Sequence, residues 1–450
     1  MRPTRALASL FALGLMMALF HRVTAAGPLE ARATLSLGFL ALTAYVGGEL
    51  ARRARLPRLT GYLLIGFAVG PAWLGLVRRE ELDALQFIED AAVSLIALAA
   101  GSELSLTALR QSRVALARLA IGASALPFAA VTLVVLSVGA RFPLTVHQAF
   151  GDVVLVALVL GAVAAASSPA FTMGMMSELG ARGPIARALL GVAVAQDAVV
   201  LFLLTLVLAA GPAFTAAGAV NGAVAAAAFL HLVGSAAVGA LLGYAVGRYL
   251  DLVPRDTALF LVALAFLAAA VARLTPLDPL ILAVAAGFYL RNFAPAGWER
   301  LRADLERRSG LPVSVVFFAL TGAGLRLGAL ADLWPWLLLI VGVRGVTLRY
   351  GTLWAGRHPS VPPALARYGW LGLVSQGGVA LSLAQLSRRA FPEWGVSLEA
   401  LIVAMIGVHE VIGPICFRTA LVRAGEATED GRDAEAPVGD GAAAASRGGL

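Results

Sequence analysis

The sequence predicts an all-α polytopic membrane protein. Of its 450 residues, 60% are hydrophobic and only 14% are charged. The chain contains many apolar runs of about 17 to 25 residues, the length that a helix needs to cross roughly 30 Å of hydrocarbon. Only helices or closed barrels satisfy the backbone in lipid, and these runs are continuously apolar rather than alternating. The spanning elements are therefore predicted to be helices.

Fourteen apolar runs are predicted to span the membrane, the first of them with an alternative given below. In chain order they cover approximately residues 6–20, 33–50, 59–77, 85–107, 114–139, 152–176, 185–210, 218–247, 257–272, 277–290, 311–330, 333–352, 368–387 and 396–417. All 35 basic residues are arginine, and a cytoplasmic N-terminus places 25 of them in cytoplasmic loops and 9 in outer loops. This asymmetry follows the positive-inside rule. The net charge of +8 thus reflects topology, and no nucleic-acid partner is predicted.

The two ends of the chain differ from the body. Residues 1–32 fit either a cleavable signal segment or an extra transmembrane helix, because two arginines precede a short apolar stretch and small residues. Residues 33–423 form the predicted transmembrane domain. Residues 424–450 are polar, rich in glycine and alanine, and lack aromatic side chains. We expect this segment to be a disordered cytoplasmic tail.

Asp197 lies near the centre of the apolar run Ile185–Ala210. A carboxylate at the bilayer centre costs about 3 kcal/mol on insertion scales, so it persists only where it faces a partner, a cavity or an ion. A structural pair with an arginine is the alternative. The sequence predicts an ion or proton site at Asp197, inside a transporter.

Two spans carry residues that interrupt a helix. In span 152–176, Pro169 removes a backbone donor, and Ser167 and Ser168 can cover the freed groups. In span 368–387 the interruption is Ser375 to Gly378, which includes Gln376 and Gly377. Each feature also has a simpler explanation, a proline kink in the first span and close helix packing at glycine in the second.

The two interruptions occupy corresponding places in the chain. The span after each one holds a mid-membrane acid, Asp197 in the first case and Glu410 in the second. Interrupted helices in corresponding halves are typical of inverted-repeat transporters with a site at the midplane. The predicted repeats are the fifth to seventh and the twelfth to fourteenth spans.

Arg344 and Glu410 are further charges at membrane depth. Arg344 lies centrally in its span, where it either supports the site or extends toward the cytoplasmic face. Glu410 stands beside His409, and it could titrate, pair with an arginine or fix its helix. Both are candidate supporting charges.

Enzyme chemistry and cofactors are not predicted. The single cysteine, Cys416, cannot form an intrachain disulfide, and no Cys/His cluster has metal-ligand spacing. No nucleophile and base, and no pair of aspartates, suit an intramembrane enzyme.

Several segments resemble the monovalent cation:proton antiporters. They are LTGYLLIGFAVGP (59–71), SLIALAAGSELSL (94–106), ASSPAFTMGMMSELGARGPIARALLGVAVAQDAVVLFLLTLVLA (166–209), VVFFALTGAGLRL (315–327), GWLGLVSQGGVALSLA (369–384) and HEVIGPICFRTAL (409–421). The resemblance covers about residues 33 to 423. Gln196 with Asp197, and Ser375 to Gly378, are most similar to the second branch, which includes Kef-type potassium-efflux systems.

The resemblance implies a fold of 13 or 14 transmembrane helices with inverted repeats and two crossing broken helices. By resemblance, Asp197 is the ion-binding proton carrier, and Ser167 and Ser168 are possible cation ligands. Arg344 falls where a basic residue pairs with the aspartate. Gln196 replaces the first of two adjacent aspartates found in electrogenic members. The chain also departs from Kef-type members, because Val379 stands in place of glutamate and a nucleotide-binding domain is missing.

The implied function is antiport of Na+ or K+ against H+ by alternating access. We expect it to be electroneutral, because Gln196 cannot ionise and Arg344 stays protonated. The resemblance further implies a multi-pass homodimer that contacts lipid in the inner membrane of a bacterial cell. A Kef-like potassium channel or a transport-dead sensor on the same scaffold is the alternative.

Overall fold

The computed structural model describes residues 3–24, 27–214, 222–252, 279–294, 310–325, 333–377 and 394–427, with a few single residues between them. Within these ranges the regular structure is entirely helical, which confirms the predicted fold class. Eight of the described helical stretches are long and apolar enough to cross a membrane. The predicted span 257–272, apart from Leu267 and Ala270, and the tail from residue 428 lie outside the described residues.

The N-terminal part of the chain forms four helices, of which the second packs against the other three. They are α1 (Pro3–Val23), α2 (Leu29–Arg53), α3 (Arg58–Val69) and α4 (Arg79–Glu103). Proline directly precedes α2 and α3, as its fixed φ and missing N–H favour at a helix start. Gly61 of α3 packs against the backbone of Gly47 and Gly48 of α2. A side chain on any of these glycines would separate the two helices.

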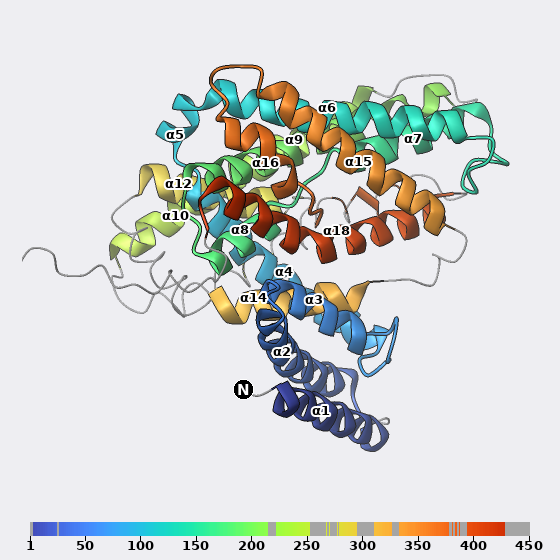
Figure 1. Cartoon of the computed structure of the whole chain (residues 1–450), viewed down its shortest axis with the longest axis vertical. Coiled ribbons are helices and arrows are strands. Elements are labelled where there is room, and N and C mark those ends of the chain that lie inside the picture. The colour runs from blue at the N-terminus through green and yellow to red at the C-terminus, as the bar shows by residue number, and fades with distance from the viewer. Residues whose placement is uncertain are drawn as a thin grey trace, which may run out of the picture.

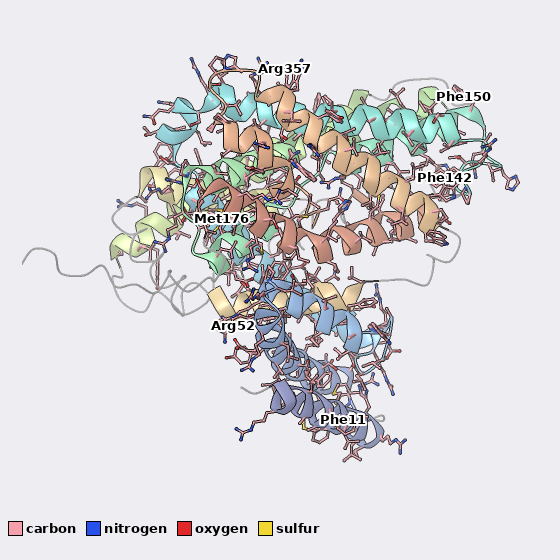
Figure 2. The ribbon with its side chains drawn as sticks, in the orientation of Figure 1. Phe11, Arg52, Phe142, Phe150, Met176 and Arg357 are labelled. Carbon is pink, nitrogen blue, oxygen red and sulfur yellow. The ribbon has the colours of Figure 1, made fainter. Side chains whose placement is uncertain are left out.

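Helix α1 is joined to the body of the protein by a buried polar contact. His21 near its end lies 3.1 Å from a carboxylate oxygen of Glu81 in the first turn of α4. Ser36 of α2 donates a hydrogen bond of 2.7 Å to the same carboxylate. The opposite face of α1 is open, because Phe11 is 75% exposed and lies at the outer edge of the molecule in Figure 2. Three helices therefore meet at Glu81.

The predicted span 152–176 is divided into two helices. These two helices are α7 (Phe150–Ala164) and α8 (Pro169–Leu179). They are preceded by α5 (Leu106–Gln111) and α6 (Arg113–Val138) and followed by α9 (Pro184–Phe214). The chain leaves helical geometry between α7 and α8, as the serines and Pro169 predicted. Gly180 ends α8 with a φ of 62°, a conformation that favours glycine.

The C-terminal half repeats this pattern. Its helices are α10 (Gly222–Leu252), α12 (Pro279–Phe293), α14 (Gly310–Gly324), α15 (Trp334–Ala355), α16 (Pro363–Gly372) and α18 (Gly395–Ala424). After α16 the chain is non-helical from Leu373 to Gly377, and helical residues recur at Ala380, Leu383, Ala384 and Ser387. The second predicted interruption is therefore also present.

The helices form two groups, which we name the scaffold group and the crossing group. The scaffold group is α2, α3, α4, α10, α12 and α14, and the crossing group is α6 to α9 with α15, α16 and α18. Figure 1 shows α6 and α15 running side by side, with α18 lying between them and the pair α3 and α14. The crossing group contains both predicted repeats, and α18 and α8 bring it against the scaffold.

The first helices of the two repeats meet at a pair of glycines. A Cβ atom on Gly351 of α15 would clash with the carbonyl oxygen of Gly122 of α6, and the converse holds for Gly122. Small residues permit such close backbone approach between membrane helices. This contact fixes α15, which carries Arg344, against α6.

We predict that Gly351→Ala destabilises the protein whereas Gly345→Ala on the same helix does not. A Cβ atom at Gly345 has no neighbour within 4 Å, so alanine there should gain about 0.5 to 1 kcal/mol of helix propensity. At Gly351 the added methyl group should cost about 1 to 3 kcal/mol through overpacking. Thermal unfolding of the purified variants measures both effects. Equal midpoints for the two variants would contradict the contact.

Candidate ion site at the helix crossing

The first break is ordered by Ser168 and Pro169. Ser168 has extended backbone angles (φ −96°, ψ 110°), and its hydroxyl oxygen accepts a hydrogen bond of 3.2 Å from the N–H of Phe171. It is thus the N-cap of α8, and Pro169 occupies the first helical position, where its missing N–H costs nothing. Beyond α7, the chain presents the carbonyl groups of Ala164 to Ala166 without helical partners.

The second break crosses the first one directly. The N–H of Ser168 donates to the carbonyl oxygen of Ser375 at 3.0 Å. The hydroxyl of Ser167 donates to the carbonyl oxygen of Leu373 at 2.8 Å. The side-chain amide of Gln376 reaches back to Val163 of α7 at 2.7 Å. The two breaks predicted from sequence therefore lie against each other.

Gly377 is needed for this close approach. A Cβ atom at this position would clash with the hydroxyl of Ser168. Glycine lets the backbone of the second break lie against the first, which is the use the sequence suggested for it.

Arg344 connects the two breaks through their carbonyl groups. Its side chain is fully buried and donates four hydrogen bonds: Nε to Ala164 at 2.9 Å, Nη1 to Val374 at 2.6 Å, and Nη2 to Ala166 at 2.6 Å and to Leu373 at 3.1 Å. The planar guanidinium group suits such a set of acceptors. Because α7 and α16 both end here, the positive charge also lies at the negative ends of two helix dipoles. These backbone contacts were not predicted from the sequence.

Gln196 has a structural role beside the crossing. Its side-chain nitrogen donates to the carbonyl oxygens of Ala123 on α6 and Ala165 in the first break, both at 3.1 Å. The residue is fully buried. An ionised carboxylate could not make these bonds, because it has no hydrogen to donate. Gln196 therefore connects α9 to α6 and to the break.

Two buried acids lie in the helices that follow the breaks. Asp197 is the next residue after Gln196 on α9 and is 7% exposed. Glu410 on α18 is 2% exposed, and one of its carboxylate oxygens lies 3.9 Å from the position that a Cβ atom on Gly377 would occupy. Glu410 thus borders the crossing.

The structure brings most of the predicted site residues together. Those with direct contacts at the crossing are Ser167, Ser168, Arg344, Gln376 and Gly377, with Gln196 bound through Ala165 and Pro169 starting α8 next to Ser168. Glu410 and Asp197 stand on the flanking helices. Sequence reasoning missed Glu89 of α4, which is discussed below. The signal that could have found Glu89 is that it is an acid inside the predicted span 85–107.

The family model described as sodium/hydrogen exchanger, transmembrane, matches residues 38–420. The chain belongs to this exchanger family. Among curated proteins, none matches the chain. The family assignment makes the chain a multi-pass membrane protein of a transporter family rather than an enzyme family.

Solved structures share the fold of this exchanger-family chain. The sodium proton antiporter MjNhaP1 from Methanocaldococcus jannaschii at pH 8 is 16% identical, with a TM-score of 0.62 over 90% of this chain and 99% of its own. An electron-microscopy structure of MjNhaP1 is 14% identical, with a TM-score of 0.67 over 87% and 96% of the two chains. These likenesses establish the antiporter fold. The Kef-type branch stays a prediction.

We predict that Arg344→Gln strongly destabilises the protein. Loss of the guanidinium group leaves buried carbonyl groups of both breaks without donors, at a cost of about 1 to 3 kcal/mol for each group left unsatisfied. Arg349→Gln is the matched control, because it removes the same charge from an exposed position on the same helix and should change stability by less than about 0.5 kcal/mol. Tryptophan fluorescence during heating of the detergent-purified variants gives both midpoints. Similar midpoints would contradict the role of Arg344.

Proposed function

We propose that the chain exchanges Na+ or K+ for H+ by alternating access, with Asp197 binding either the proton or the cation. The observation that carries this proposal is the crossing itself, where the backbones of two interrupted helices meet deep in an apolar bundle. Such unwound segments supply cation ligands in transporters built from inverted repeats. The exchanger family supports Na+ and H+ as substrates.

The chemistry requires one group that binds two ligands in competition. A carboxylate holds either a proton or a cation, and a monovalent cation binds only its ionised form. Ser167 and Ser168 lie at the crossing, and a hydroxyl oxygen has two acceptor lone pairs in addition to its donor. They support Asp197 as further oxygen ligands for a cation.

The charges of the groups at the site favour electroneutral exchange. Gln196 is neutral, and its amide is bound to two carbonyl groups. Arg344 is bound to four carbonyl groups and does not give up its proton at physiological pH. One carboxylate that exchanges one proton for one cation transfers no net charge.

Alternating access requires that one part of the protein move relative to another. The boundary between the crossing group and the scaffold group is the surface at which such rocking would occur. We propose further that the protein works as a homodimer in the lipid of a bacterial inner membrane.

We predict that Asp197→Asn abolishes cation-dependent proton movement. Asparagine keeps the size of the side chain but cannot exchange a proton for a cation. Purified protein in liposomes, with a pH dye inside, should show exchange with NaCl or KCl in the wild type and only the protein-free background in the variant. Wild-type rates in the variant would reject the assignment.

Asp83→Asn is the matched control for this experiment. Asp83 is an exposed aspartate in the first turns of α4, with 70% of its side chain accessible. We expect exchange at the wild-type rate. A wild-type protein that cannot move the cation against its gradient under an imposed pH gradient would instead be a channel or a sensor.

We predict that the equilibrium point of exchange does not change with membrane potential. One proton exchanged for one cation carries no current, so a potassium or lithium diffusion potential should leave the final cation gradient unchanged. Exchange in liposomes with clamped voltage measures this point for each cation. A shift with voltage would show net charge movement and contradict the one-for-one ratio.

A further inference from the structure

Glu410 is an unusually buried acid that antiport through Asp197 does not require. It is 2% exposed, and its Oε2 atom has no hydrogen-bond partner among the described residues. A buried ionised carboxylate is costly unless a positive charge or several donors compensate it. The groups around Glu410 therefore decide whether its carboxylate stays ionised.

Glu410 faces a second acid across the boundary between the two helix groups. A Cβ atom on Gly407, one turn before Glu410, would lie 3.1 Å from the side chain of Leu325, the residue directly after α14. One turn back along α14, the hydroxyl of Thr321 donates to Glu89 of α4 at 3.0 Å. Thr321 and Leu325 are four residues apart and therefore share one face of this segment, which thus contacts both Glu89 and the turn of α18 before Glu410. The two acids therefore both lie near the place where the end of α14 approaches α18.

A further polar group is directed at the same face of α18. The hydroxyl oxygen of Ser375 lies 3.2 Å from the position of a Cβ atom on Gly413, one turn after Glu410. Ser375 is 3% exposed, and its hydroxyl has no partner among the described residues. Gly377 also places the second break beside Glu410. Oxygen atoms from the crossing and from two acids thus converge here.

No basic side chain is seen to neutralise the two acids in the described part of the protein. Arg344 is occupied by four carbonyl groups, and Arg58 at the start of α3 pairs with Glu49 at 3.2 Å. The titratable and charged groups on the surrounding elements include Asp90 and Glu103 of α4, Tyr62 and Arg58 of α3, Glu178 of α8, Asp197 of α9, Arg344 of α15, and Glu399, His409 and Arg418 of α18. Two facing carboxylates in an apolar interior do not both stay ionised without a positive charge between them.

The internal repeat gives Glu410 a counterpart. Gln196 and Asp197 follow the first break, and His409 and Glu410 follow the second break in the corresponding helix. Each repeat therefore contributes one buried acid beside the crossing. This correspondence is independent of the contacts with Glu89.

We propose that Glu410 and Glu89 form a second binding site for one positive charge, a proton or a monovalent alkali cation, between the crossing and scaffold groups. Thr321 holds the Glu89 carboxylate, and Ser375 offers a hydroxyl oxygen to the same ion. The site goes beyond the antiport proposal, because it does not depend on Asp197. A cation that replaces the proton here exchanges one charge for one charge, so electroneutrality is retained.

Infrared spectroscopy of the purified full-length protein tests the site. In Asp197→Asn, without Na+ or K+ and at neutral pH, we expect the carbonyl stretch of one protonated carboxyl group. The band should be lost in the double variant with Glu410→Gln. It should stay in the double variant with Glu399→Gln, which changes another buried glutamate of the same helix. If Glu410→Gln does not fold, Glu89→Gln in the Asp197→Asn background should shift the band.

Added salt distinguishes the two sources of charge. Loss of the band in NaCl or KCl, but not in choline chloride, identifies an alkali cation that displaces the proton. A band that persists in all three salts identifies a proton site. A band unchanged by both Glu410→Gln and Glu89→Gln would overturn the proposal. Failure of the antiport proposal is separate, because it is detected as absent exchange in the wild type in liposomes.

Discussion

The rest of the structure depends on how Arg344 satisfies the carbonyl groups of two interrupted helices. Lipid offers no water to a free carbonyl group, so a broken helix survives in a membrane only if protein groups supply the missing donors. One guanidinium group does this for both breaks at once, through Ala164 and Ala166 on one side and Leu373 and Val374 on the other. Burying the charge of Arg344 costs free energy, but its hydrogen bonds stabilise the two interrupted helices.

Close packing at glycine places Arg344 where these bonds form. The contact between Gly122 and Gly351 brings α15 against α6, and Gly377 brings the second break against Ser168. Gln196 then binds Ala123 of α6 and the first break together. Local backbone approach and buried polar bonds thus support each other, and the two repeats hold one another in place.

Much of this architecture follows from the sequence, because its signals are local. Continuous apolar runs predicted helices, Ser-Ser-Pro and Gly-Gly predicted the breaks, and the cost of burial singled out Asp197 and Arg344. Contacts between backbone carbonyl groups and distant side chains leave no such signal, so the bonds of Arg344 and Gln196 were missed. The predicted span 59–77 was too long. Its helix ends at Val69 although the residues stay apolar, because Gly70 is extended (φ −68°, ψ 176°) and is followed by Pro71, which has no N–H to continue the helix.

The two bonds of Gln196 have a consequence for how this protein can evolve. An aspartate at this position would turn acceptor atoms toward the carbonyl oxygens of Ala123 and Ala165, which now receive hydrogens from the amide. A single substitution that adds a second ionisable group would therefore also weaken the joint between α9, α6 and the break. Under the proposed exchange mechanism, the number of charges moved per cycle is therefore linked to this joint, and changing that number requires a new donor to Ala123 and Ala165.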